Sequence, residues 1–253
     1  MRHRRVLACA ALAMSVALVH ELRSPTASAQ MMGHGMMGGG MMGGSNGNAM
    51  GEVMAWMQGR ELAEVPTAPE PAATKELLAN GREVYDARCA VCHGEHGDGK
   101  GPQADKLDPV PRDFTRGVYA FRSTPSGSLP TDEDIWKTIS DGLHGTAMVP
   151  WVSLSERDRW ALVAYLKTFS ASFSAKPAGK SIAIPATPAV TPKLVAEGKT
   201  LYKDAGCVSC HGTEGRGDGT SAPELKDVAG HPIKATDFTK GPFRRGSTMS
   251  EFI

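Results

Sequence analysis

The chain has 253 residues, of which 41% are hydrophobic, 22% are charged and only 6% are aromatic. This balance fits one or two globular domains, and the 29 glycines and 17 prolines indicate that the domains are small and rich in loops. Such domains bury too little surface to fill a core with side chains alone, so a large apolar cofactor would help to stabilise them. Without residues 1–29 the chain has 24 basic and 26 acidic groups, and a net charge near −2 does not indicate nucleic-acid binding.

The first 29 residues have the pattern of a secretory signal peptide. Three arginines within the first five residues precede the apolar stretch Val6–Val19, and Ala27-Ser28-Ala29 is a cleavage site of the A-x-A type. The apolar stretch is short for a membrane span, which needs about 20 residues. The alternative is an uncleaved membrane anchor. We therefore expect export to the periplasm, with membrane contact only through partners or through such an anchor.

Four segments follow the signal peptide. The first, residues 30–73, is nearly pure Met and Gly up to residue 50, and we expect it to be flexible. The others are a compact stretch, a semi-rigid linker rich in Ala and Pro, and a second compact stretch, at residues 74–170, 171–190 and 191–253. The methionines of residues 31–57, together with His34, are suited to bind Cu(I) through soft thioethers. A flexible tether is the favoured interpretation of that part.

The second compact stretch repeats the pattern of the first. Cys89-Ala-Val-Cys92-His93-Gly94 returns as Cys207-Val-Ser-Cys210-His211-Gly212, 118 residues later. Asp-Phe-Thr follows both motifs, at residues 113–115 and 237–239. Before each motif, four residues recur at i, i+4, i+7 and i+8, the spacing of one helix face. These residues are Leu77, Gly81, Val84 and Tyr85 in the first copy and Leu194, Gly198, Leu201 and Tyr202 in the second. Two tandem domains of one fold are the simplest interpretation.

Two further helices are predicted in the first domain. Capping boxes at Thr131–Asp134 and Ser155–Asp158 precede apolar residues at helical spacing. No alternating strand pattern of useful length appears, so the predicted fold class is all-α, with two tandem domains. The second copy stops before the place of both helices. We expect them, with a Gly-Thr-x-Met loop, beyond Ile253.

Cys-x-x-Cys-His is the attachment signature of c-type haem. The two intervening residues form about one turn, so both thiols reach one porphyrin edge and the adjacent imidazole reaches the iron. The motifs predict two haem c groups, with attachment and proximal ligation by Cys89, Cys92 and His93 and by Cys207, Cys210 and His211. Zinc sites, thioredoxin-like pairs and plain disulfides fit less well. The pairs lie too far apart for zinc, no βαβ pattern surrounds them, and disulfides do not explain a histidine in the same place twice.

A low-spin haem needs a second axial ligand. Met148 is the candidate in the first domain, because it lies in the loop between the two predicted helices. A thioether favours ferrous iron and raises the reduction potential. His144 is a rival ligand, and a core methionine that fills a gap is the structural alternative. In the second domain Met249 aligns with the stretch before the missing helices, so we expect the ligand beyond the last residue, with His231 as a weaker substitute.

These residues resemble the class I cytochrome c family in its bacterial, dihaem, periplasmic form. The resemblance covers residues 74–170 in full and 191–253 in part, and it rests on Cys-x-x-Cys-His-Gly, the Gly/Tyr helix face and the Gly-Thr-x-Met loop. It implies that the N- and C-terminal helices of a domain cross beside the haem, with Gly81 allowing close approach near Tyr165. One departure is Val149, because the family commonly has proline directly after the ligand methionine.

The predicted function is single-electron transfer between redox protein partners, either by a free carrier or by a haem c subunit of a larger oxidoreductase. The resemblance implies shuttling between membrane complexes and terminal reductases or oxidases. No catalytic residue, small-molecule substrate or nucleic-acid partner is predicted. The alternative is a dihaem peroxidase-type enzyme, which needs an iron with an open or displaceable sixth position. Met148 disfavours that alternative in the first domain, and the sequence does not decide it in the second.

Overall fold

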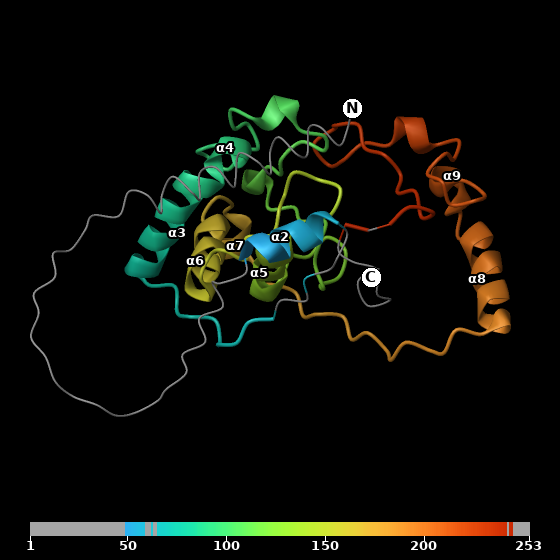
Figure 1. Ribbon diagram of the computed structural model, residues 1–253, viewed down its shortest axis with the longest axis horizontal. Helices are drawn as coiled ribbons and strands as arrows, with labels where there is room; N and C mark the ends of the chain where they lie inside the picture. The colour runs from blue at the N-terminus through green and yellow to red at the C-terminus, as the bar shows by residue number, and fades with distance from the viewer. Residues whose placement is uncertain (1–48, 59–61, 63–64, 242, 245–253) are drawn as a thin grey trace, which may run out of the picture.

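The structure is a computed structural model, which describes residues 49–58, 62, 65–241 and 243–244. The predicted signal peptide, the Met/Gly-rich residues 30–48 and Met249 lie outside the described residues. Within those residues there are helices and no strand, which confirms the all-α fold class. The elements are α2 (Ala49–Met57), α3 (Lys75–Arg88), α4 (Ala90–His93), η2 (Ala104–Lys106), η3 (Phe114–Arg116), α5 (Asp132–Asp141), α6 (Glu156–Lys167), α7 (Ser172–Ala175), α8 (Pro192–Asp204), α9 (Val208–His211) and η4 (Ala222–Glu224) (Figure 1).

Helices α3 and α6 cross at close range in the first domain. A Cβ atom at Gly81 of α3 would lie 2.1 Å from the carbonyl oxygen of Ala161 and 2.9 Å from the Cβ atom of Tyr165, both on α6. Real Cβ contacts are longer, so only glycine permits this approach of the two backbones. The crossing has the partners that the family resemblance implies.

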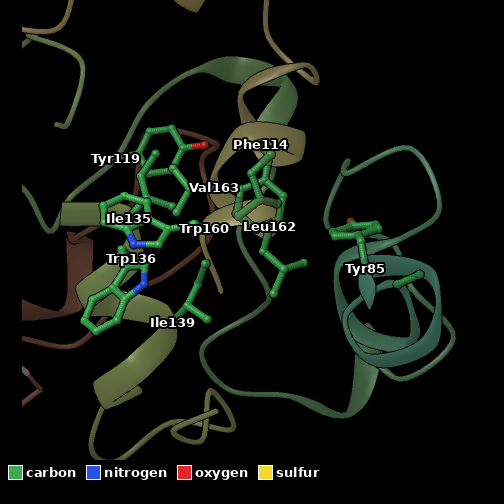
Figure 2. Close-up of a cluster of buried hydrophobic side chains, with 11 residues drawn as sticks. Tyr85, Phe114, Tyr119, Ile135, Trp136, Ile139, Trp160, Leu162 and Val163 are labelled. Carbon is green, nitrogen blue, oxygen red and sulfur yellow. The ribbon is translucent and has the colours of Figure 1, made fainter. Parts of the chain in front are cut away.

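The core of the first domain lies between α5 and α6. The ring centroids of Trp136 and Trp160 are 5.8 Å apart, and both side chains are at least 97% buried. Figure 2 shows them beside Ile135 and Ile139, while Tyr85 extends from α3. Large side chains therefore fill the centre of this domain on the side of α5.

The two predicted capping boxes begin α5 and α6, but only the first is complete. Thr131 accepts the N–H of Asp134, and the Asp134 carboxylate accepts the N–H of Thr131. Ser155 likewise accepts the N–H of Asp158. The Asp158 carboxylate, however, accepts from the Ser155 hydroxyl and from the side-chain amide of Asn80, at 2.8 Å each. The second box is half-formed because Asp158 links α6 to α3 instead.

Part of the segment that we expected to be flexible packs against the first domain. Trp56 of α2 is 3% exposed and packs with Val149, which lies between α5 and α6. Farther along, the Glu156 carboxylate accepts the N–H and hydroxyl of Thr67 and the N–H of Ala68, at 2.9, 2.5 and 2.9 Å. An apolar contact and a carboxylate therefore attach these residues to the first domain, in contrast to the expected flexible segment.

The described residues of the second domain repeat the first part of the fold. Thr191 caps α8 by accepting the N–H of Leu194 at 3.1 Å, and Pro192 begins the helix, as the sequence predicted. Helix α8 has no buried residue, and a Cβ atom at Gly198 would meet nothing within 4 Å. In the described part of the chain, α8 therefore has no counterpart of the α3–α6 crossing. Figure 1 shows it far from α3 and α6.

The two domains meet through contacts between loops. The N–H of His144 donates to the carbonyl oxygen of Arg244 at 3.1 Å. The Arg116 guanidinium donates to the carbonyl of Val228 at 2.7 Å, and the Lys234 ammonium lies 3.7 Å from the Asp108 carboxylate. The linker also contacts the first domain, because the N–H of Ile182 donates to the carbonyl of Ser123 at 2.9 Å. Among the described helices, none combines the length and the apolar character needed to cross a membrane.

Candidate haem centres

In the first domain the Cys-x-x-Cys-His motif forms a single helical turn. Helix α3 ends at Arg88, and Cys89 separates it from the short α4, which begins at Ala90. The Cys89 carbonyl accepts the N–H of Cys92 at 3.1 Å and the N–H of His93 at 2.9 Å. Both thiols and the imidazole consequently project from one turn, as the spacing predicted.

The His93 ring is fixed by a backbone carbonyl and an aromatic ring. Its Nδ1 lies 3.1 Å from the carbonyl oxygen of Arg112. Since a carbonyl only accepts, Nδ1 carries the proton and Nε2 keeps its lone pair. The ring also stacks on Phe114, with centroids 4.6 Å apart and planes 23° apart. Burial lowers the pKa of His93 to about 4, so at neutral pH its imidazole is the uncharged form that binds metals.

The second domain repeats this arrangement. The Cys207 carbonyl accepts the N–H of His211 at 2.9 Å. His211 Nδ1 lies 3.0 Å from the carbonyl oxygen of Thr236, and its ring stacks on Phe238 with centroids 4.3 Å apart and planes 22° apart. Two centres with equivalent contacts in one chain support one role for both.

A tyrosine of the preceding helix anchors the residue after each motif. The Tyr85 hydroxyl donates to the Gly94 carbonyl at 2.6 Å, and the Tyr202 hydroxyl donates to the Gly212 carbonyl at 2.7 Å. Tyr85 is fully buried and Tyr202 is half-buried. These bonds fix the motif turn against the helix that precedes it.

Sequence reasoning found the repeated Asp-Phe-Thr but not its role. The Asp113 carboxylate accepts both the N–H and the hydroxyl of Thr115, and Asp237 and Thr239 form the same turn. This turn places Phe114 and Phe238 against the histidine rings. It also places the carbonyl of the residue before each tripeptide at the histidine Nδ1. The sequence indicated this tripeptide only by repeating it after both motifs. Its role depends on the loop folding back onto the motif, which the sequence does not show.

The four motif cysteines have the chemistry that covalent haem attachment needs. All are free thiols, so none is consumed by a disulfide. Burial, with the neighbouring Cys92, raises the pKa of the Cys89 thiol to about 12. Free thiols one turn apart, beside an imidazole whose Nε2 lone pair is available, fit the thioether bonds and proximal ligation of haem c.

Met148, the predicted distal ligand, lies in the loop between α5 and α6. It is half-buried, its N–H donates to the Thr146 hydroxyl at 3.0 Å, and its carbonyl accepts the N–H of Leu143 at 2.8 Å. The rival ligand His144 is buried in the same loop and stacks on Trp56. Ligation of the iron by Met148 stays a prediction.

His231, the weaker substitute in the second domain, already has a partner. Its Nδ1 lies 3.2 Å from the Asp227 carboxylate, which also accepts the N–H groups of His231 and Ala229. These bonds belong to a loop turn closed by an isolated bridge between Lys226 and Pro232. His231 therefore has a structural role in that turn.

Two family matches correspond to the two domains. Residues 76–166 match the family described as cytochrome c oxidase, cbb3-type, subunit III, and residues 195–249 match the family described as cytochrome c. Each match includes one of the two Cys-x-x-Cys-His motifs. The tandem arrangement and the haem c cofactor predicted from the sequence are thereby confirmed.

Individual relatives agree with these matches. The chain is 26% identical over 147 residues to the Cbb3-type cytochrome c oxidase subunit CcoP of Helicobacter pylori (strain ATCC 700392 / 26695), covering 56% of this chain and 40% of the relative. It is 30% identical over 169 residues to the subunit of the same name from Azospirillum sp. (strain B510), covering 60% of this chain and 47% of the relative. This chain therefore spans less than half the length of either curated relative.

A solved structure covers more of the chain. A chain of the reducing HAO-like protein complex of Kuenenia stuttgartiensis is 45% identical, with a TM-score of 0.66. The likeness covers 70% of this chain and 79% of that one. At this identity and coverage, and with both motifs in equivalent settings, the chain belongs to the family of c-type cytochromes with tandem haem-binding domains.

Proposed function

We propose that this protein transfers single electrons in the periplasm through two covalently bound haems. In this proposal Cys89, Cys92 and His93 hold the first haem, with Met148 as its distal ligand. Cys207, Cys210 and His211 hold the second. The observation that carries the proposal is the equivalent setting of the two histidines, each with Nδ1 at a backbone carbonyl and its ring against a phenylalanine.

The protein's own groups would serve electron transfer by keeping the iron ligands in place. A hydrogen bond from Nδ1 to a carbonyl fixes the ring orientation and makes Nε2 a better donor to iron. The stacked Phe114 and Phe238 restrict rotation of the same rings. When bound, the haem supplies the one-electron chemistry. A rigid ligand set lowers the reorganisation that accompanies each change of iron charge.

The partners proposed for this chain are redox proteins within or beside a respiratory complex. The names of the relatives support this proposal. The relatives are named as subunits of a cbb3-type cytochrome c oxidase and of a reducing HAO-like complex. Export by residues 1–29 would place both haems in the periplasm.

The full chain, produced in a bacterial host that attaches c-type haem, tests the proposal. We expect a mass increase of two haems and a reversible one-electron couple for each. Replacing Cys207 and Cys210 with alanine should remove one haem and one couple, and the matched change at Cys89 and Cys92 should remove the other. Protein without covalent haem would contradict the proposal. Turnover of hydrogen peroxide with an electron donor would contradict a pure carrier.

A further inference from the structure

Helix α2 exposes two methionines to solvent. Met50 and Met54 are 50% and 47% exposed, whereas Trp56 of the same helix is 3% exposed. Met57 and Met148, the other methionines among the described residues, are half-buried. Burial in a core therefore does not account for the residue type at these two exposed positions.

The spacing of the two exposed methionines brings their thioethers together. Met50 and Met54 stand at positions i and i+4 of a helix that runs from Ala49 to Met57. Side chains at this spacing are neighbours on the helix surface, with Cβ atoms about 5–6 Å apart. Methionine is unbranched and has three rotatable bonds, so the two sulfur atoms can approach one ion between them.

The first domain holds the helix that carries this pair. Trp56 packs with Val149 and Trp151 of the loop between α5 and α6. Around the helix axis, Trp56 lies about 200° from Met54 and about 240° from Met50, at roughly 100° per residue. The helix is thus attached through one side and presents the pair on the other. A pair that is already held on a folded helix needs little further ordering when it binds an ion.

The chemistry of the pair selects a soft cation. Thioethers are soft, uncharged ligands and favour Cu(I), whereas carboxylate and carbonyl oxygens suit Mg²⁺, Ca²⁺ and Mn²⁺. Glu52 is the only charged residue of α2, so the helix adds a negative charge near the pair and no positive charge. In the described part of the chain, no group of His, Cys, Asp and Glu side chains is arranged to hold a metal ion.

We propose that Met50 and Met54 form a Cu(I) site on the exposed side of α2. The ion is held between the two thioether sulfurs, and the ligand set favours the cuprous state. The site uses no residue of the two haem centres, so it goes beyond the proposed function. Residues before α2 are not needed for it, although they are rich in methionine.

The full-length holoprotein, kept free of oxygen and with its haems reduced, tests the site. Haem attachment removes the motif thiols from competition for copper, and ferrous haem does not oxidise Cu(I). Equilibrium dialysis against Cu(I), with copper measured by mass spectrometry, gives the copper bound per chain. Met50→Leu combined with Met54→Leu should lower the bound copper by about one ion per chain, because leucine has no sulfur. X-ray absorption at the copper edge should show fewer sulfur neighbours in this variant.

Two controls remove methionines and leave the pair in place. Met57→Leu changes the half-buried methionine of the same helix, and Met41→Leu combined with Met42→Leu removes the same number of thioethers from the preceding sequence. Both should keep the ion that the Met50 and Met54 variant loses. Leucine is close to methionine in volume and in helix propensity, so the circular dichroism of all variants should match that of the wild type.

Three outcomes would overturn the inference. The first is a wild-type chain that takes up no Cu(I), and the second is unchanged uptake when Met50 and Met54 are replaced. The third is an equal loss in either control, because the number of thioethers, and not their place on α2, would then determine binding. None of these outcomes affects the haem content or the one-electron couples, so the proposed function is tested separately.

Discussion

A backbone carbonyl and an aromatic ring fix each histidine of the two motifs, and a tyrosine hydroxyl then fixes the turn that carries it. Tyr85 and Tyr202 make the same hydrogen bond, at 2.6 and 2.7 Å, but in different surroundings. Tyr85 is fully buried, so water cannot replace its bond to the Gly94 carbonyl. Tyr202 is half-buried, so its side chain is more accessible to water than that of Tyr85.

Tyr85→Phe is therefore expected to lower the free energy of unfolding by about 0.5–1.5 kcal/mol, because the Gly94 carbonyl loses a buried hydrogen bond and keeps only the N–H of Gly97 as a donor. Tyr202→Phe should cost less, about 0.5 kcal/mol or below, since the half-buried Tyr202 side chain already competes with water for its hydrogen bond. Urea unfolding of the two variants against the wild-type chain measures both values. Equal costs would show that burial does not distinguish the two bonds.

At these positions the sequence predicted the residues but not their acceptors. The spacing of Leu77, Gly81 and Tyr85 placed the tyrosine on the buried face of a helix. The partner is a backbone carbonyl, however, and every residue has one, so no residue type identifies it. For the same reason, the sequence did not predict that the carbonyls of Arg112 and Thr236 accept hydrogen bonds from the two histidines.

At the scale of elements, the repeat provides a matched pair of glycines. Gly81→Ala should destabilise the first domain by about 1–3 kcal/mol or more, because the new Cβ atom would meet the Ala161 carbonyl at 2.1 Å. Gly198→Ala meets nothing within 4 Å, and alanine favours helix by roughly 0.5–1 kcal/mol over glycine. Thermal unfolding followed by circular dichroism checks both. If Gly198→Ala lowered the thermal stability of this chain, the exposed position of α8 would be contradicted.

The residues just before α3 carry a carboxyl group with an unusual pKa. Partial burial, with the hydrogen bond and charge of Asp132, raises the pKa of Glu70 to about 7, although the charge of Lys167 opposes the shift. A raised folded-state pKa means that the protonated form stabilises the fold. This contribution is complete below the unfolded pKa of about 4.5 and is lost as the pH rises through about 7.

Glu70→Gln should consequently flatten the dependence of unfolding free energy on pH between about 4.5 and 7, because glutamine has no proton to lose. Urea titrations at several pH values measure the slope. Glu83→Gln, on the exposed surface of α3, is the control and should keep the wild-type slope. A wild-type slope in Glu70→Gln would mean that another group is responsible.

Helix α2 shows why composition alone did not predict this part of the fold. The Met- and Gly-rich sequence before it indicated a flexible segment, and that interpretation was extended through residue 73. Residues 49–57 contain only one glycine and an apolar run around Trp56, which is enough for a short helix once another surface receives it. The receiving surface includes His144 and Val149, about 90 residues away in the sequence, and no local pattern reports such a contact.

At the scale of the whole molecule, the two copies differ in the loop between the Cys-x-x-Cys-His motif and the Asp-Phe-Thr tripeptide. The motifs are offset by 118 residues and the Asp-Phe-Thr tripeptides by 124, so the second copy has additional residues between the two features. The structure places a turn there, closed by the bridge between Lys226 and Pro232, and Val228 at its tip accepts the hydrogen bond from Arg116. The insertion is visible in the sequence, but its contact with the first domain is not, because it depends on the path of the linker.

The bonds of this turn to the first domain lead to a prediction about the arrangement of the domains. Arg116 is exposed, so its bond to the Val228 carbonyl contributes only about 0.5–1.5 kcal/mol, and the exposed pair of Lys234 and Asp108 contributes about 1 kcal/mol or less. Arg116→Ala should therefore shift the population towards separated domains and increase the radius of gyration measured by small-angle X-ray scattering. Arg82→Ala is the control, because it removes an arginine that pairs with Asp86 within α3, and it should leave the radius unchanged.

High salt should increase the radius of gyration of the wild-type chain by weakening the Lys234 pair. The increase should be smaller in Arg116→Ala, because its domains are already apart. A radius insensitive to both changes would mean that the domains are held together by contacts other than this turn.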